Sequence, residues 1–184
     1  MEKIQSGTVL IADPFLKDPN FLRTVIFLCE HNTEEGSFGF VLNRKLDYVV
    51  GDLITALDGH DFPVFYGGPV QQNTIHFLHR CPALITGGEE IANGIYWGGE
   101  FDEVAELIKN NKLDDTDVRL FLGYSGWGES QLENEFAEKT WLTTYSSEKL
   151  IFSADVNTIW KDALKQIGGK YEQLIHYPID PQLN

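Results

Sequence analysis

Ser125 is the residue of this chain whose setting comes nearest to that of a catalytic nucleophile. It lies in Gly123-Tyr-Ser-Gly-Trp127. The nucleophile elbow of serine hydrolases needs Gly-x-Ser-x-Gly on a strand-to-helix turn, because glycines tolerate the strained backbone. Trp127 stands in place of the last glycine, while Asp155 and His176 follow in the chain order of such a triad. Because the motif is broken, a structural glycine-rich turn is the favoured interpretation, and a serine hydrolase using Ser125 is the alternative.

Two pairs of cysteine and histidine have the composition of a zinc site. Cys29-x-His31 and His79-x-Cys81 each place both side chains on one face of an extended strand. Together they would supply a Cys₂His₂ tetrahedron. The spacing lacks the usual knuckle form, and nothing in the sequence makes the two strands neighbours. We therefore favour buried thiols and hydrogen-bonded histidines, and we expect no metal and no cofactor.

Two strand ends and the glycine-rich turn carry residues that could bind a ligand. Arg44 could form bidentate contacts with a carboxylate or phosphate, and glycines in a loop can expose backbone amides to an anion. No phosphate-loop motif is present. A tight turn and a solvated arginine are therefore the competing interpretation. The candidate ligand-binding set is Asn43, Arg44, Gly67, Gly68, Tyr124 and Trp127.

The composition indicates one globular domain, residues 1–184, with an acidic surface. The chain has 28 acidic residues against 14 Lys and Arg, a formal net charge of −14, and 42% hydrophobic residues. Such a charge repels phosphate backbones, so direct nucleic-acid binding is not expected. Two cysteines form no disulfide framework, and neither a signal peptide nor a membrane span is evident, so we expect a cytoplasmic protein.

The segment 62–88 is unusual because it contains no Asp or Glu. Arg80, His76 and His79 are its only side chains that can carry a charge. Buried central strands are the favoured interpretation. A neutral or faintly basic surface that receives an acidic ligand or partner is the alternative.

Short apolar segments bounded by Gly, Pro, Asn or Asp predict a series of strands. The predicted strands are Thr8–Ala12, Thr24–Cys29, Phe38–Leu42, Val64–Tyr66, Thr74–Leu78, Ile95–Trp97, Val118–Leu122 and Leu150–Phe152. Helical periodicity covers 101–108 and a segment from Asp155, as N-cap, to Gly168, with a weaker helix over Val49–Leu57. Ser130 and Glu133 form a capping-box pattern at the start of another helix.

The order of these elements favours the α+β class. The early strands come without intervening helices, and the clearest helices lie in the second half of the chain. An alternating doubly wound sheet would require a different order.

Taken in order, several motifs resemble the YqgE/AlgH family of small bacterial proteins. They are Gly7-Thr-Val-Leu-Ile-Ala-Asp-Pro14, Phe21-x-Arg-Thr-Val25, Cys29-Glu-His-Asn32, Gly36-Ser-Phe-Gly-Phe-Val-Leu-Asn-Arg44, Gly67-Gly-Pro-Val70, Gly123-Tyr-Ser-Gly-Trp127, Gln131-Leu-Glu133, Trp141 and Asp180-Pro-Gln-Leu-Asn184. The resemblance implies an α+β fold on a bent, barrel-like, mostly antiparallel sheet with about four helices. Members are often labelled transcriptional regulators, from a link to alginate production, without an established activity. The resemblance therefore implies no catalytic residue and no cofactor.

The sequence as a whole predicts a non-enzymatic protein that acts by binding. The expected partner is a protein or a small anionic ligand, and the acidic charge argues against regulation through direct DNA contact. We expect no membrane association.

Overall fold

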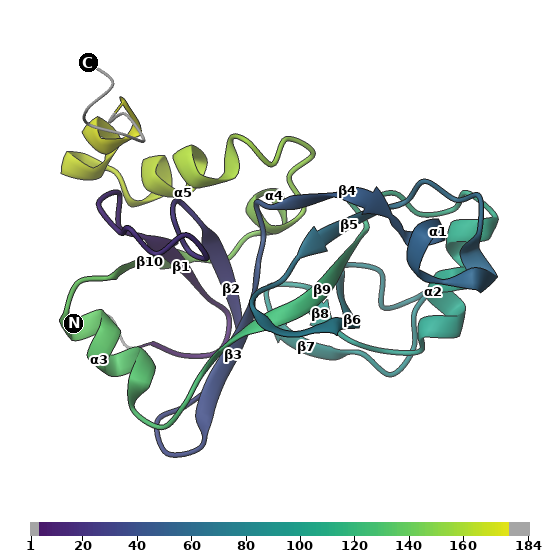
Figure 1. Cartoon of the computed structure of the whole chain (residues 1–184), viewed down its shortest axis with the longest axis horizontal. Helices are drawn as coiled ribbons and strands as arrows, with labels where there is room; N and C mark the ends of the chain where they lie inside the picture. The colour runs from purple at the N-terminus through teal and green to yellow at the C-terminus, as the bar shows by residue number, and fades with distance from the viewer. Residues whose placement is uncertain (1–3, 177–184) are drawn as a thin grey trace.

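A strongly bent β-sheet with helices packed on it forms the protein, and the computed structural model describes residues 4–176 (Figure 1). Its strands are β1 (Thr8–Ala12), β2 (Val25–Asn32), β3 (Gly36–Val41), β4 (Lys45–Val49), β5 (Pro63–Tyr66), β6 (Val70–His79), β7 (Glu89–Ala92), β8 (Ile95–Trp97), β9 (Val118–Trp127) and β10 (Trp141–Tyr145). Its helices are α1 (Val50–Leu53), α2 (Phe101–Lys109), α3 (Gln131–Ala137), α4 (Glu148–Ile151) and α5 (Ile159–Ile167), with 3₁₀-helices η1 (Thr55–Leu57) and η2 (Gly169–His176). The predicted α+β class is confirmed.

Strand β9 joins the two halves of the sheet. The strand order is β10-β1-β2-β3-β9-β6-β8-β7, β5 pairs with β4 and β9, and every pairing is antiparallel except β5 with β9. The last residues of β9 pair with β3, and its first residues pair with β5 and β6. Gly123 lies between these regions at φ 67°, where a Cβ would be 2.6 Å from the Val70 carbonyl oxygen. Only glycine fits this bend.

Three apolar clusters hold the helices against the sheet. The largest contains Phe27, Phe40 and Phe121 and is covered by α4, α5 and η2. A second includes Leu132 of α3 and lies on the opposite face of β1, β2 and β3. The third packs α1 and α2 against β5, β6 and β9, with Val104 of α2 fully buried.

The structure confirms most of the predicted strands and corrects one of them. Leu150–Phe152 is not a strand, because residues 148–151 form α4 and the Ser147 hydroxyl accepts a bond from the Leu150 amide at 3.3 Å. A short apolar segment does not distinguish a buried helix from a strand. Strands β4, β7 and β10 were not predicted; they lie at or near sheet edges and carry exposed residues that mask a strand pattern.

The glycine-rich segment is strand and not turn, which is a further correction. Residues 123–127 continue β9, and the chain leaves the sheet only at Gly128. The predicted capping box is absent: Ser130 has a left-handed backbone (φ 54°) and its side chain makes no cap bond. Instead, Gln131 Oε1 accepts from the Gly128 amide at 3.0 Å. Glycine spacing alone does not reveal an extended backbone.

The predicted helices 101–108 and 49–57 are confirmed as α2 and as α1 with η1. The predicted helix after Asp155 begins later, at Ile159, with Thr158 as its N-cap. Asp155 Oδ1 instead accepts from the Asn157 amide in the preceding turn at 3.0 Å. Within residues 4–176, no helix is long and apolar enough to cross a membrane. The closing motif Asp180–Asn184 lies outside the described residues.

Candidate ligand-binding site

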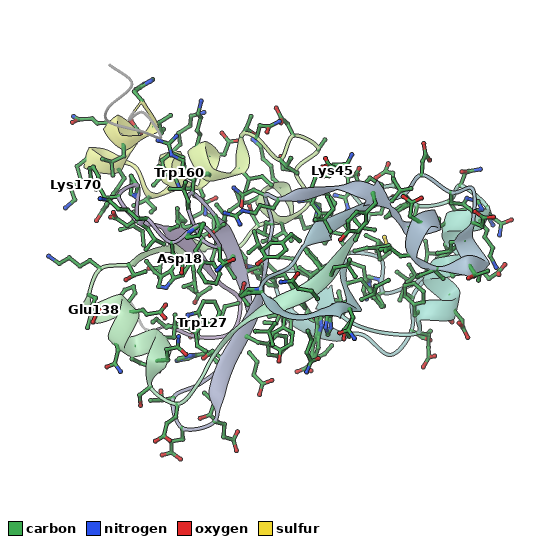
Figure 2. The ribbon with its side chains drawn as sticks, in the orientation of Figure 1. Asp18, Lys45, Trp127, Glu138, Trp160 and Lys170 are labelled. Carbon is green, nitrogen blue, oxygen red and sulfur yellow. The ribbon has the colours of Figure 1, made fainter. Side chains whose placement is uncertain are left out.

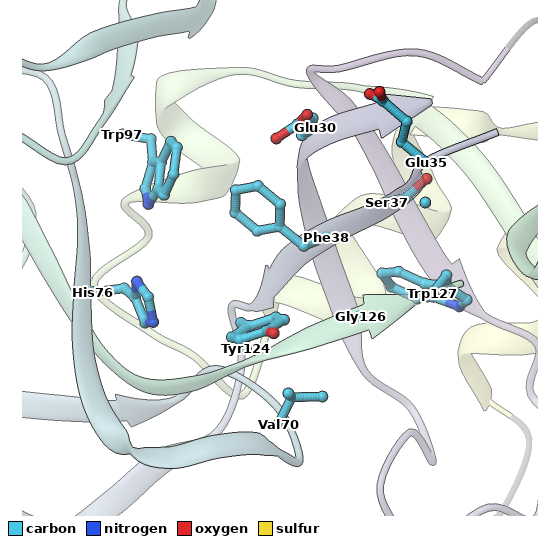
Figure 3. A pocket seen from close by; sticks show the side chains of 11 residues that line it. Glu30, Glu35, Ser37, Phe38, Val70, His76, Trp97, Tyr124, Gly126 and Trp127 are labelled. Carbon is cyan, nitrogen blue, oxygen red and sulfur yellow. The ribbon is translucent and has the colours of Figure 1, made fainter. Parts of the chain in front are cut away.

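A cavity of about 500 Å³ lies where β3, β6, β8 and β9 come together (Figure 3). Phe38 reaches it from β3, His76 from β6, Trp97 from β8 and Tyr124 from β9. All four side chains are half-buried, so each keeps part of its ring accessible. The complete lining is Glu30, Glu35, Gly36, Ser37, Phe38, Val70, His76, Trp97, Tyr124, Gly126 and Trp127.

Neighbouring aromatic rings that line the cavity are steeply inclined to one another. The Phe38 and Trp97 ring centroids are 4.9 Å apart at an interplanar angle of 62°. Tyr124 lies 6.0 Å from Phe38 at 78° and 5.9 Å from His76 at 83°. Such edge-to-face contacts stabilise the rings in place. Gly126, opposite Phe38 in the β3–β9 register, also lines the cavity and contributes no side chain to it.

A β-bulge turns the Glu30 carboxylate toward this cavity. Directly opposed residues of an antiparallel pair lie on the same face, and Phe27 faces Phe40. Unbroken alternation would place Cys29 opposite Phe38. The register shifts between Leu28 and Glu30, so Glu30 pairs with Phe38 and shares the face of the cavity. Bulges commonly re-aim side chains beside functional sites.

Negative charge prevails around the cavity. Burial raises the pKa of the Cys29 thiol well above its usual value, and the nearby carboxylates of Glu89 and Glu30 raise it further. Burial also lowers the pKa of His76, which keeps its imidazole neutral near pH 7. No Lys or Arg is among the residues lining this cavity in the described chain. The site therefore suits a neutral or cationic ligand better than an anion.

The acid-free segment contributes one wall of the cavity. Within β6, Phe77, Leu78 and His79 are buried, as the favoured interpretation of this segment predicts. Val70 and His76 are only half-buried and line the cavity. The end of β6 is therefore buried, as the favoured interpretation predicts, and its beginning lines the cavity; reception of an acidic ligand by this segment stays a prediction.

We expect the protein to lose stability as the pH falls from about 7.5 to about 5.5. Burial lowers the pKa of His76 and of the fully buried His79 below the ordinary histidine value of 6.5. As the pH falls below 6.5, the unfolded chain therefore binds more protons than the folded chain. The stability that these neutral histidines contribute is complete above that pH and is lost as the pH falls toward their folded-state pKa values. Urea midpoints measured across this range check the slope. The variant His76→Gln should flatten it, and an unchanged profile would contradict the assignment.

Tyr124 and Trp127, predicted as ligand-binding residues, have different surroundings. Tyr124 forms a wall of the cavity. The Trp127 indole packs in the cluster on the other face of the sheet, and its Nε1 donates to Glu135 Oε2 at 2.9 Å. Figure 2 shows Trp127 on the α3 side of the molecule, away from Trp160 and α5. Trp127 thus reaches only the margin of the cavity.

Asn43 and Arg44, also predicted as ligand-binding residues, line a separate cavity of about 580 Å³ with Lys45 and Tyr66. Asn43 is engaged at both ends of its amide, accepting from the Val25 amide at 2.9 Å and donating to the Arg23 carbonyl at 2.8 Å. Arg44 donates to the carbonyls of Pro19 and Leu22 at 2.9 and 3.3 Å. Both residues therefore hold the 19–25 segment against the end of β3.

Gly67 and Gly68, the remaining predicted site residues, make close contact with β9. The Gly67 amide donates to Leu122, and its carbonyl accepts from the Val41 amide at 2.9 Å. A Cβ on Gly68, whose φ is 155°, would be 2.2 Å from the Tyr124 carbonyl carbon. These glycines let the chain pass in close contact with β9, and neither lines the aromatic cavity or the Arg44 cavity.

Ser125 is fully buried within β9, and its hydroxyl donates to the Gly67 carbonyl at 3.1 Å. Asp155 and His176 are exposed, before α5 and at the end of η2. A nucleophile elbow presents its serine at an accessible turn. Ser125 instead lies within a strand, and its hydroxyl is used in a hydrogen bond to the backbone.

The cysteines and histidines considered for zinc are used elsewhere in the fold. Among the described residues, no three His, Cys, Asp or Glu side chains are placed to hold a metal. His31 Nδ1 lies 2.8 Å from Ser37 Oγ, and its Nε2 lies 3.5 Å from Glu133 Oε1. His79 Nδ1 accepts from the Cys81 amide at 3.3 Å. Glu133 also accepts from the Thr33 hydroxyl at 2.8 Å, which fixes the β2–β3 hairpin to α3.

Sequence reasoning missed Phe38, Trp97 and Glu30 as site residues. His76 was noted only as a side chain that can carry a charge in the segment 62–88, which has no Asp or Glu. The bulge that turns Glu30 and the pairing that brings β8 to β6 depend on tertiary register, which no local pattern reveals.

The pattern of the AlgH-like family matches residues 9–172. A UPF0301 protein of Chlorobium luteolum is 40% identical over 183 residues, which cover 100% of this chain and 96% of the relative. The chain belongs to the AlgH-like family. A UPF0301 protein of Cytophaga hutchinsonii is 37% identical over 182 residues, covering 98% of this chain and 100% of that protein.

Solved structures show the same AlgH-like architecture. The solution structure of the AlgH protein from Pseudomonas aeruginosa matches with a TM-score of 0.74 at 25% identity, covering 97% of this chain and 98% of that one. The crystal structure of a Corynebacterium diphtheriae protein matches with a TM-score of 0.78 at 22% identity, covering 96% and 94%. The second likeness shows the shared fold alone.

Proposed function

We propose that this AlgH-like protein is a non-enzymatic binding protein whose ligand occupies the aromatic cavity between β3, β6, β8 and β9. The observation that carries the proposal is the half-exposed box of Phe38, Trp97, Tyr124 and His76. Small-molecule sites are concave, lined by aromatic and apolar side chains, and carry few polar groups. Ligand occupancy would then govern contact with a protein partner, which is the form of regulation we favour.

Hydrolysis by Ser125 is the weaker alternative. Its hydroxyl is fully buried and bonded to a backbone carbonyl, so attack on a substrate would require the sheet to open. Regulation by direct DNA contact is also weaker, because the net charge of −14 repels the duplex. The unpaired cysteines Cys29 and Cys81 support a cytoplasmic location.

The Arg44 cavity is a second candidate site, for a small anionic ligand. Arg44 and Lys45 are the charged residues among its lining, and Asn157 and Gln72 add amide groups. Arg44 already bonds two carbonyls, and burial lowers its pKa. The aromatic cavity, whose rings are free to contact a ligand, therefore ranks first.

A thermal-shift screen of small molecules tests the aromatic cavity when it is run in parallel on two variants. Val70→Phe introduces a ring from a half-buried position on the cavity wall, and Leu84→Phe adds the same ring at a position that is 50% exposed elsewhere. We expect stabilising ligands of the wild type to lose their effect with Val70→Phe and to keep it with Leu84→Phe. Ligands that stabilise both variants equally would contradict the proposed site.

A further inference from the structure

Three of the cavity walls have the arrangement of an aromatic cage. Phe38 meets Trp97 at 62° and Tyr124 at 78°, so their rings form adjoining walls around one opening. Figure 3 shows Trp97, Phe38, Tyr124 and His76 around that opening. The face of an aromatic ring carries partial negative charge, and several faces around one cavity attract an alkylated ammonium group.

The carboxylates near the cage strengthen this preference for a cation. The bulge in β2 places Glu30 beside Phe38, and Glu89 is paired with Trp97 in the β7–β8 register. Both carboxylates raise the pKa of the Cys29 thiol, and Cys29 packs in the same apolar cluster as Phe38 and Trp97. Glu30 and Glu89 are exposed, so neither is committed to the core.

We propose that the aromatic cavity binds a methylated ammonium group, with Phe38, Trp97 and Tyr124 enclosing the methyl groups and Glu30 facing the charge. The inference rests on the proposed function and names the ligand class of that site. A trimethylammonium group sheds water more readily than a primary amine, so ring contacts replace its hydration at low cost. The remaining volume of the 500 Å³ cavity accommodates the rest of the ligand.

Other ligand classes fit the cavity less well. An anion would face Glu30 and Glu35 with no cation among the described lining residues. A neutral apolar ligand would contact the rings but gain nothing from the carboxylates. The charge of the ligand therefore distinguishes cationic from neutral and anionic ligands at this cavity. Two probes that have the same shape and differ in charge test the inference directly.

The probes are choline and its uncharged isostere 3,3-dimethylbutan-1-ol, titrated into ¹⁵N-labelled full-length protein and followed by NMR. We expect choline to bind at least about tenfold more tightly than the alcohol, which corresponds to about 1.4 kcal/mol of cation–π and charge attraction. Trp97→Ala should abolish choline binding. Glu30→Gln should weaken it about threefold or more, whereas Glu34→Gln, the same charge change at an exposed position in the β2–β3 turn, should leave it unchanged.

The outcomes separate this inference from the proposed function. Equal affinity for choline and the alcohol would overturn the ammonium assignment and leave the cavity as the site. The same conclusion would follow if choline does not bind while other ligands do and Val70→Phe blocks their binding. A trimethyllysine peptide provides the second arm. Tighter binding of the peptide than of choline would support an ammonium carried by a protein, and tighter binding of choline would support a free small molecule.

Discussion

Replacing Glu135 with alanine is expected to lower the free energy of unfolding by about 3–4 kcal/mol. Glu135 Oε2 accepts the indole N–H groups of Trp127 and Trp141 at 2.9 and 2.7 Å, and its Oε1 accepts from Gln131 at 2.8 Å. The two tryptophans are only 5% and 2% exposed, so their N–H groups would stay buried without an acceptor. Each such loss costs about 1–3 kcal/mol.

Two variants make the Glu135 result specific. Glu135→Gln keeps an acceptor oxygen and should cost only about 1 kcal/mol. Glu138→Ala removes an exposed carboxylate at the end of the same helix and should stay within about 0.5 kcal/mol of the wild type. Urea unfolding followed by far-UV circular dichroism gives all three values. A Glu135→Ala protein as stable as Glu138→Ala would show that the carboxylate does not hold the two indoles.

Arg119→Ala is expected to cost about 3–4 kcal/mol and to lower Tm by roughly 10 °C. Arg119 is fully buried in β9, donates to the carbonyls of Leu42 and Ser153 at 3.2 and 2.6 Å, and lies 4.5 Å from the Phe65 ring centroid. Burial lowers its pKa to about 10, although the Asp115 carboxylate opposes part of this shift. Among the described residues, no carboxylate forms an ion pair with Arg119. Truncation removes its packing and leaves a cavity beside Phe65.

Arg119→Met separates packing from charge. Methionine keeps most of the apolar part of the arginine side chain. Removing the charge also removes the desolvation penalty of the buried guanidinium, about 3 kcal/mol. This gain offsets most of the cost of leaving two carbonyls without a donor, which is about 1–3 kcal/mol each. We therefore expect a net loss of about 1 kcal/mol for Arg119→Met. Differential scanning calorimetry of both variants checks this; equal losses would assign the whole effect to the hydrogen bonds instead of the packing.

The fold was largely predictable because most of its strands are short buried runs between turn residues. Val118–Leu122 shows the limit of this approach. Its apolar residues predicted a strand, but the strand continues through Gly123 to Trp127, where glycines suggested a turn. The extension is stabilised by pairing with β3 on one side and with Val70 of β6 on the other. Pairing partners so distant in the chain leave no signal in local sequence.

The candidate site was predictable only in part, for the same reason. Tyr124 was singled out because of its motif, and it does line the cavity. Arg44 and Asn43 are polar groups at a strand end, which predicts ligand binding, yet their side chains bond to backbone carbonyls and amides. Trp97 and Glu30 gave no signal, because a register shift and a strand pairing bring them to the site. Residue type predicts chemistry, whereas tertiary register decides which residues meet.

The indole N–H resonances of the four tryptophans provide the most direct test of the proposed binding site. A mixture of cationic, neutral and anionic aromatic fragments is added to ¹⁵N-labelled protein. We predict that the Trp97 signal shifts, while those of Trp127 and Trp141, bonded to Glu135, and of Trp160, bonded to the Ala12 carbonyl, stay in place. If fragments shift the Trp127 and Trp141 signals and leave Trp97 unchanged, the binding site lies on the other face of the sheet and the account is wrong.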